Sequence, residues 1–204
     1  PARGGTLDHR RPARRSVPER CVLGDREHTY RVAADGFWQV HREAPAALTR
    51  AVLDGVGDVD GARVLDLYSG AGLFTSPLAA AVGDAGTVLA VEGDERAVRD
   101  ARRNAHGLER VELRHGPVEQ VLAQDGSGAD VVVLDPPRVG AGRAVVEAVA
   151  GREPSRVVYV ACDPAALARD VSYLAEHGYG LTSLRAFDLF PMTHHLEAVA
   201  VLTR

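Results

Sequence analysis

The stretch VLDLYSGAGLFT, residues 64–75, decides the fold of this chain. It opens with an apolar pattern typical of a buried strand, passes through a turn that holds Gly70 and Gly72, and ends where a helix pattern begins. Glycines at such a turn allow a ligand to approach the backbone closely. We therefore expect a strand, a ligand-binding turn and a helix in succession. Tight packing of the strand on the helix is the alternative explanation for the glycines.

Two further residues indicate which ligand suits this turn. Thr75 stands where a dinucleotide-binding fingerprint has its third glycine, which argues against a ligand with a pyrophosphate. Glu92 ends the next expected strand, where a carboxylate can accept hydrogen bonds from ribose hydroxyls. An adenosyl ligand without phosphates, S-adenosylmethionine, fits this pattern best.

Outward from this stretch, short apolar segments alternate with amphipathic ones. The segments RVVYV and DVVVL are apolar on both faces, as parallel strands are when helices cover both sides of a sheet. We predict strands at 63–67, 87–92, 111–115, 130–135, 157–162, 181–188 and 196–202, and helices near 73–82, 95–106, 118–124, 143–150 and 165–177. The alternation indicates an α/β fold with a doubly wound, mostly parallel, seven-stranded Rossmann-like sheet. Because the linker DLFPMTHH is too short for a parallel crossover, the last strand should run antiparallel.

The first part of the chain differs from the rest in pattern and in charge. Residues 20–32 predict a hairpin around a Gly24-Asp25 turn, and residues 43–56 predict a helix. Residues 1–31 hold eight arginines and four acidic residues, whereas residues 32–204 hold sixteen arginines and twenty-four acidic residues. A basic arm over residues 1–19 could touch phosphates, and a solvated terminus is the alternative.

Composition limits the class of protein. The two cysteines, Cys21 and Cys162, are far apart in sequence, which excludes a disulfide framework and a CxxC metal site from this chain and favours a reduced pair. No apolar run approaches the roughly 18 residues of a membrane span. The residues PARGGTLDHRRPARR do not form a secretory signal. We expect a cytoplasmic protein.

The predicted topology gathers the residues that carry chemistry. Ligands of open α/β sheets bind at the carboxyl ends of the parallel strands, and an antiparallel last strand begins at that same edge. We therefore expect one rim, which contains Gly70, Glu92, Asp135, Cys162 and Glu197.

Two strand ends of this rim carry distinctive motifs. In DPPR, two prolines make a rigid loop that aims Asp135 outward, although an N-capping aspartate is the alternative. Arg138 stands where methyltransferases of exocyclic amines carry an aromatic residue, which argues against that chemistry. In ACDP, Cys162 precedes a helix whose dipole should favour its thiolate. The general alternative for a lone cysteine is a buried, inert side chain.

Two polar segments lie outside the parallel strand ends. In FPMTHHLE, His195 or Glu197 could act as an acid or base, because a carboxylate in an apolar strand is costly unless it is used or paired. For His194 we favour loop packing or RNA contact, and a metal site is a weak hypothesis because the histidine pair lacks a third ligand. In GFWQVH, the aromatics could wall the cofactor, stack on a base or cover a sheet edge.

Taken in order, the motifs FWQVH, DLYSGAGLFT, VEGD, LDPPR, VACDP and FPMTHHLE resemble those of the RNA uracil-5-methyltransferase family, over roughly residues 20 to 204. The resemblance implies Cys162 as the nucleophile and Glu197 as the general base. It implies an S-adenosylmethionine site formed by Gln39, Asp66, Tyr68, Gly70, Gly72, Glu92 and Asp135. It implies a transfer or ribosomal RNA substrate, whose uridine would be bound by Phe37, Asp135 and His195. We expect no metal from this chain.

The resemblance also predicts a division of the chain and exposes two departures. Residues 1–19 would be an arm, residues 20–58 a remnant of a central domain, and residues 59–204 the S-adenosylmethionine-dependent methyltransferase domain. The family usually has asparagine at the positions of Asp163 and His41, and a carboxylate beside Cys162 should disfavour its thiolate. The RNA-binding domain that precedes the family's catalytic part, and the cysteines that bind an iron–sulfur cluster in some members, lie outside this sequence. Two alternatives remain: a cofactor-binding fragment without activity, and a methyltransferase of another base or a small molecule.

Overall fold

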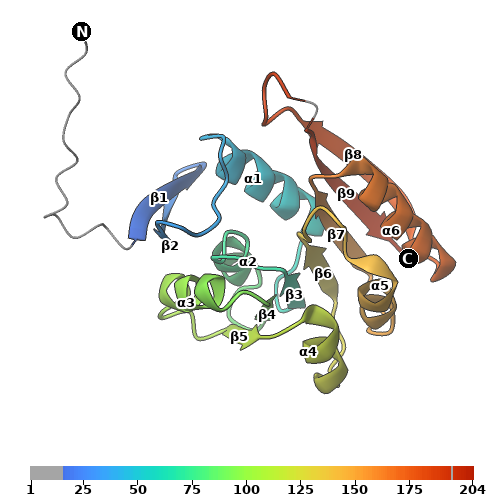
Figure 1. Ribbon diagram of the computed structural model, residues 1–204. Helices are drawn as coiled ribbons and strands as arrows, with labels where there is room; N and C mark the ends of the chain where they lie inside the picture. Colours follow the sequence, from blue (N-terminus) through green and yellow to red (C-terminus); the bar gives the residue numbers. More distant parts are fainter. Residues whose placement is uncertain (1–15, 194) are drawn as a thin grey trace, which may run out of the picture.

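Seven strands form one sheet in the computed structural model, which describes residues 16–193 and 195–204 (Figure 1). The strand order is β5-β4-β3-β6-β7-β9-β8, and β9 runs antiparallel to both of its neighbours. The other pairs in the sheet are parallel. The bounds of the strands are β3 Arg63–Leu67, β4 Thr87–Glu92, β5 Val111–His115, β6 Val131–Leu134, β7 Arg156–Ala161, β8 Gly180–Phe187 and β9 Glu197–Thr203.

In the described part of the chain, six helices pack against this sheet, and both of its faces are buried. Alternate residues of one strand belong to different hydrophobic clusters: Val64 packs with the side of α1 and α2, and Leu65 with the side of α4, α5 and α6. Figure 1 shows the two sets of helices on opposite sides of the sheet. The bounds are α1 Ala44–Val56, α2 Thr75–Ala81, α3 Glu95–Asn104, α4 Val118–Gln124, α5 Gly142–Ala150 and α6 Pro164–Glu176.

The predicted fold class is confirmed. Each predicted strand and helix is present, with bounds within a few residues of those expected from the apolar pattern. The antiparallel last strand is also confirmed, since the nine residues between Phe187 and Glu197 are too few for a parallel crossover. The sequence pattern did not reveal that β9 inserts between β7 and β8.

A separate hairpin packs beside the sheet. Strand β1 (Ser16–Leu23) pairs antiparallel with β2 (Arg26–Ala33) around the predicted Gly24-Asp25 turn. The hairpin is longer than the pattern predicts, because β1 already begins at Ser16. Residues of the hairpin and of α1 share a hydrophobic cluster with one face of the sheet.

The described helices are short relative to a bilayer. The longest of them have 13 residues, and none of the described helices is long and apolar enough to cross a membrane.

Candidate active site

The turn after β3 has an unusual backbone. Tyr68, Gly70 and Gly72 all have positive φ angles, of 63°, 55° and 90°. For tyrosine this conformation is uncommon, and such strain is concentrated at functional sites. A Cβ atom built on Gly70 meets nothing within 4 Å, so the space above this residue is open. The partly buried ring of Tyr68 packs against the hydrophobic cluster on the side of the sheet that α4, α5 and α6 cover. Burial raises the pKa of its hydroxyl to about 12.

Glu92 binds the backbone of this turn. One carboxylate oxygen accepts a hydrogen bond from the Gly70 N–H at 2.8 Å, and the other accepts one from the Asp94 N–H at 2.7 Å. The carboxylate therefore joins the ends of two adjacent parallel strands, β3 and β4. Each oxygen retains acceptor capacity for a ligand hydroxyl.

Asp66 lies beneath the turn and is fully buried. The Thr75 hydroxyl donates a hydrogen bond of 2.5 Å to one of its oxygens, which ties β3 to the start of α2. Burial raises the pKa of Asp66 to about 7, the Thr75 hydrogen bond lowers it, and the charge of Glu92 raises it further. The other Asp66 oxygen and the Ser69 hydroxyl are buried without a hydrogen-bond partner among the described residues. Unpaired buried polar atoms beside an open turn suit a polar ligand.

Asp135 follows β6 and lies half-buried at the same edge of the sheet. Its backbone N–H donates to Leu67, and helix α5, the next along the chain, is capped by Ala141, so Asp135 is not an N-capping residue. Burial holds the pKa of Asp135 well above its usual range, and the charges of Glu197, Asp66 and Glu92 add to this. The carboxyl groups of the rim are therefore close enough to oppose one another's ionisation.

Cys162 directly follows β7 and is half-buried. Burial raises the pKa of its thiol, and the charges of Glu197 and Asp135 raise it further, while the Cys162 backbone hydrogen bond and the Arg138 charge lower it. The expectation that a helix start alone would favour the thiolate is therefore wrong for this chain. Burial and the two neighbouring carboxylates outweigh the local backbone.

Asp163 does not act on Cys162 as the sequence suggested. It caps helix α6, because its side chain accepts a hydrogen bond of 2.8 Å from the Ala166 N–H. The charges that raise the pKa of Cys162 belong to Glu197 and Asp135, not to Asp163. Asparagine caps helices equally well, so the departure from the family pattern preserves the structural role.

Glu197 is the first residue of β9 and is buried. Its neighbour Ala198 pairs with Ala161, which brings Glu197 beside the end of β7. Burial raises the pKa of Glu197, and the guanidinium of Arg138 lowers it. A carboxylate whose pKa lies above its usual range is a better proton acceptor near neutral pH.

His195, on the loop between β8 and β9, lies next to Arg138 of the DPPR loop. A nitrogen of the Arg138 guanidinium is 3.3 Å from Nε2 of His195, so this ring nitrogen must be the acceptor. Phe190 packs its edge against the His195 ring with 5.9 Å between the centroids. His194 lies outside the described residues. Within the described part of the chain, no group of three or more His, Cys, Asp and Glu side chains could hold a metal ion.

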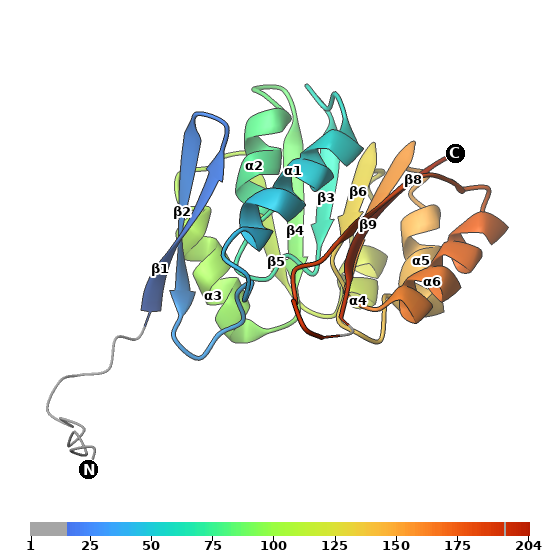
Figure 2. The same cartoon turned by 90° about the horizontal axis from the view of Figure 1, so that it is seen from above.

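Gln39 and Phe37 lie on the loop between β2 and α1. Figure 2 shows this loop and the β8–β9 loop at the edge to which the β3 arrow points. Gln39 is half-buried and Phe37 is 76% exposed, and no hydrogen bond joins Gln39 to the rim among the described residues. Nδ1 of His41 accepts a hydrogen bond of 3.2 Å from the Glu43 N–H, a role that the family's asparagine could also fill.

Sequence reasoning missed the residues that anchor the DPPR loop. Asp170 is fully buried, and one of its oxygens accepts hydrogen bonds from the Tyr159 hydroxyl at 2.6 Å and the Ala141 N–H at 2.7 Å. Arg169 donates to the Val139 carbonyl at 2.7 Å. The available signal was a carboxylate three residues after Leu167, on the buried face of helix α6.

The structure thus brings the predicted residues into two groups at one edge of the sheet. The first, around the turn after β3, contains Asp66, Gly70 and Glu92. The second contains Asp135, Cys162 and Glu197, and the mutual charge effects of Asp66, Glu92 and Asp135 connect the two groups. A thiol, two carboxyl groups and an adjacent open turn can support covalent catalysis on a substrate beside a bound cofactor.

Comparisons with known protein families assign two parts of the chain. Residues 122–204 match the model described as tRNA (Uracil-5-)-methyltransferase, and residues 64–136 match a general methyltransferase domain. A protein of Streptomyces avermitilis described as an uncharacterized RNA methyltransferase is 52% identical over 175 residues, which are 85% of this chain and 40% of that protein. A similarly described protein of Streptomyces coelicolor is 49% identical over 195 residues, 95% of this chain and 42% of that protein.

A solved structure is also similar. The Pyrococcus abyssi tRNA (uracil-54, C5)-methyltransferase, in complex with S-adenosyl-L-homocysteine, has a TM-score of 0.77 and 32% identity. The match covers 93% of this chain and 45% of that chain. This chain therefore spans less than half the length of these relatives.

Proposed function

We propose that this chain carries a catalytic domain of the RNA (uracil-5-)-methyltransferase family and transfers a methyl group from S-adenosylmethionine to carbon 5 of a uridine in RNA. The observation that carries the proposal is that Cys162 directly follows β7, between the end of β6, which Asp135 follows, and the start of β9, where Glu197 stands. Its expected substrate is transfer or ribosomal RNA. Transfer RNA is tested first, because the family model and the P. abyssi enzyme are named for it.

The turn after β3 suits the cofactor. The open space above Gly70 lets a ligand approach the backbone, and the Glu92 carboxylate retains lone pairs for ribose hydroxyls. The partnerless buried atoms of Asp66 and Ser69 provide further polar contacts. Gln39, Tyr68, Gly72 and Asp135 complete the proposed site. When bound, S-adenosylmethionine supplies the electrophilic methyl group that carbon 5 receives.

Cys162 and Glu197 supply the chemistry that uracil lacks. Carbon 5 of uracil is a poor nucleophile, and addition of the Cys162 thiolate to carbon 6 forms a carbon–sulfur bond and places negative charge on carbon 5 and the carbonyl oxygen. After carbon 5 is methylated, the Glu197 carboxylate removes its proton. The electron pair of that bond restores the double bond between carbons 5 and 6 and expels the thiolate.

The remaining residues would hold the uridine. We expect Asp135, held by the two prolines that follow it, to contact the edge of the base, and His195 is positioned by Phe190 and Arg138. Because the base must leave its stack to reach Cys162, the exposed ring of Phe37 is proposed to stack on it.

The test uses the full chain, an unmodified transfer RNA transcript and S-adenosylmethionine with a labelled methyl group. We expect labelled 5-methyluridine after nuclease digestion and mass spectrometry. Cys162→Ala abolishes transfer, and Glu197→Gln accumulates a covalent chain–RNA adduct on a denaturing gel, because the thiolate adds but cannot leave. Cys21→Ala is the matched control, since Cys21 is the other cysteine of the chain and is buried in β1 of the hairpin. Full activity of Cys162→Ala would falsify the proposed nucleophile.

A second candidate is a cofactor-binding unit without activity of its own. It is favoured because this chain spans less than half the length of its relatives. Calorimetric binding of S-adenosylmethionine without methyl transfer to the unmodified transfer RNA would support it. A different methylated nucleoside would instead indicate another target base.

A further inference from the structure

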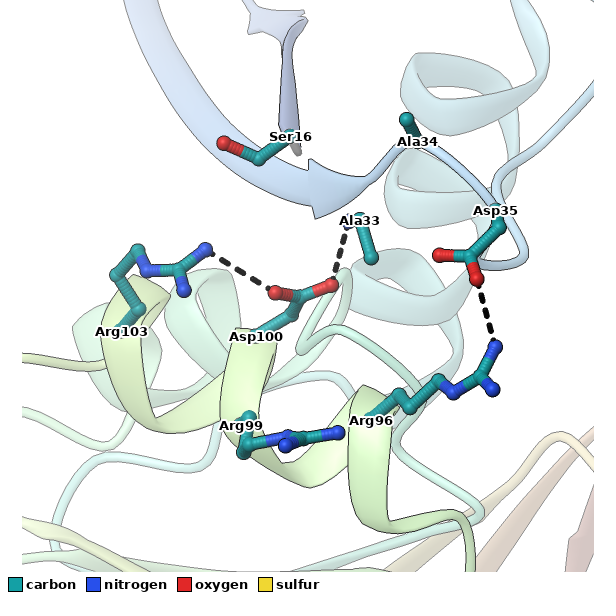
Figure 3. A pocket seen from close by; sticks show the side chains of 8 residues that line it. All are labelled: Ser16, Ala33, Ala34, Asp35, Arg96, Arg99, Asp100 and Arg103. Carbon is teal, nitrogen blue, oxygen red and sulfur yellow. Dashed lines mark hydrogen bonds and ion pairs between the residues drawn. The ribbon is translucent and has the colours of Figure 1, made fainter. Parts of the chain in front are cut away.

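An open pocket lies away from Cys162, between the end of the hairpin and helix α3 (Figure 3). Its volume is about 580 Å³. The proposed function leaves this pocket without a role. We call it the arginine pocket. It is lined by Ser16, Ala33, Ala34, Asp35, Arg96, Arg99, Asp100 and Arg103.

The arginines of this pocket form one face of α3. Arg96, Arg99 and Arg103 are spaced by three and four residues, so their side chains project from the same side of the helix. Val98 and Ala101, on the opposite side, are buried against the fold. The arginine face is therefore turned away from the sheet and toward the end of the hairpin, which forms the other wall of the pocket.

The acidic residues of the pocket are already engaged. Asp100 is buried, accepts a hydrogen bond from the Ala33 N–H at 2.6 Å and pairs with Arg103 at 3.1 Å. Asp35 pairs with Arg96 at 2.7 Å. Figure 3 shows Arg99 between these two pairs, and Arg99 has no hydrogen bond or ion pair with any residue that the structure describes. One guanidinium thus remains for an external anion.

The pocket gathers positive charge within an acidic part of the chain. Three arginines and two aspartates line it, whereas residues 32–204 have a net charge of −8. Helix α3 begins three residues after Glu92, so the pocket starts close to the rim of the proposed active site. A polyanion that reaches the rim can extend along this face.

We propose that the arginine pocket binds the phosphate backbone of the RNA substrate, with Arg99 as its phosphate ligand. RNA as the partner rests on the proposed function, but the contact itself does not depend on methyl transfer. Phosphate contacts position a nucleic acid without reading its sequence. The pocket would therefore bind RNAs of unrelated sequence similarly.

Fluorescence anisotropy with two labelled RNA stem-loops of unrelated sequence tests the proposal, with the full chain carrying Cys162→Ala so that no chemistry intervenes. We expect Arg99→Gln to weaken binding of both RNAs roughly threefold to tenfold at low salt. The slope of log K against log salt concentration should become shallower by about one, the value for one lost phosphate contact. Arg26→Gln is the matched control. Arg26 is also exposed and has no ion pair with a described residue, but it lies at the opposite end of the hairpin.

Three outcomes overturn the proposal: no binding of either RNA by the parent chain, an unchanged salt slope in Arg99→Gln, or an equal loss in Arg26→Gln. A loss confined to one RNA sequence also contradicts a phosphate contact. If Arg99→Gln weakens binding as expected while the chain with Cys162 intact transfers no methyl group, the phosphate contact stands and the proposed function fails.

Discussion

The reactivity of Cys162 depends on residues from other strands. Its position before a helix suggests a stabilised thiolate, yet Asp135 from the end of β6 and Glu197 from the start of β9 surround it with negative charge. Arg138 opposes this charge and affects both Cys162 and Glu197. The balance was not visible in the local sequence, because it depends on which strand ends are neighbours in the sheet.

This balance can be measured as the pH dependence of Cys162 alkylation. Glu197→Gln removes a nearby negative charge and should lower the pKa of the thiol, whereas Arg138→Gln removes the opposing positive charge and should raise it. Iodoacetamide labelling from pH 7 to 10, followed by peptide mass spectrometry, separates Cys162 from the buried Cys21. The control is Glu147→Gln, which removes an exposed charge from α5. Identical profiles for all variants would contradict the proposed arrangement of charges.

Asp66 should make the stability of the chain depend on pH. Its pKa is about 7 in the fold and near its ordinary value in the unfolded chain, so the unfolded chain releases the proton first as pH rises. Stability should therefore fall between about pH 4 and pH 7, by on the order of 1.4 kcal/mol per pH unit at most, and then level off. Asp66→Asn still accepts the Thr75 hydrogen bond but cannot ionise. Urea unfolding at several pH values should show the variant gaining stability relative to the parent up to neutral pH, and a constant difference would refute the assignment.

At the scale of elements, the apolar pattern was sufficient for the sheet and its helices. Strands such as β7, buried on both faces, and helices such as α6, with a proline in the first turn, carry their signals locally. Contacts between residues far apart in the sequence leave no such local pattern. The pairing of Asp170 with Tyr159 and the packing of the hairpin on α3 join segments that no periodicity connects. The rim was therefore predictable as a set of strand ends, but not its charges or the arginine pocket.

The cap of α6 distinguishes a structural role of Asp163 from an electrostatic one. Asp163→Ala leaves the Ala166 N–H without its acceptor and should lower the free energy of unfolding by about 1 kcal/mol. Asp163→Asn should retain nearly all of the stability and leave the Cys162 alkylation profile almost unchanged, because the carboxylate faces the helix backbone. Chemical denaturation gives the first quantity and labelling the second. A large shift of the Cys162 profile in the asparagine variant would restore the electrostatic role expected from the sequence.

At the scale of the whole molecule, the hairpin is held to the sheet by polar and apolar contacts together. The buried Tyr30 hydroxyl donates a hydrogen bond of 2.9 Å to the Leu73 carbonyl, next to the proposed cofactor turn. The Asn104 side chain bonds both the N–H and the carbonyl of Arg31. These links join the segment assigned from the sequence as a domain remnant to the same core as the sheet. The proposed cofactor turn therefore depends on a segment outside the Rossmann-like sheet.

The single tryptophan allows this connection to be tested. Trp38 lies 5.2 Å from Tyr30 between ring centroids, so its fluorescence reports the hairpin and the following loop, while circular dichroism at 222 nm reports mainly the helices. If the segments unfold as one unit, the two signals should follow the same urea transition. Tyr30→Phe leaves the Leu73 carbonyl without its donor and should lower the free energy of unfolding by about 1–3 kcal/mol in both signals together. A Trp38 transition that precedes the circular dichroism transition, or a Tyr30→Phe effect seen by fluorescence alone, would instead show that the hairpin is an independent unit whose loss leaves the sheet folded.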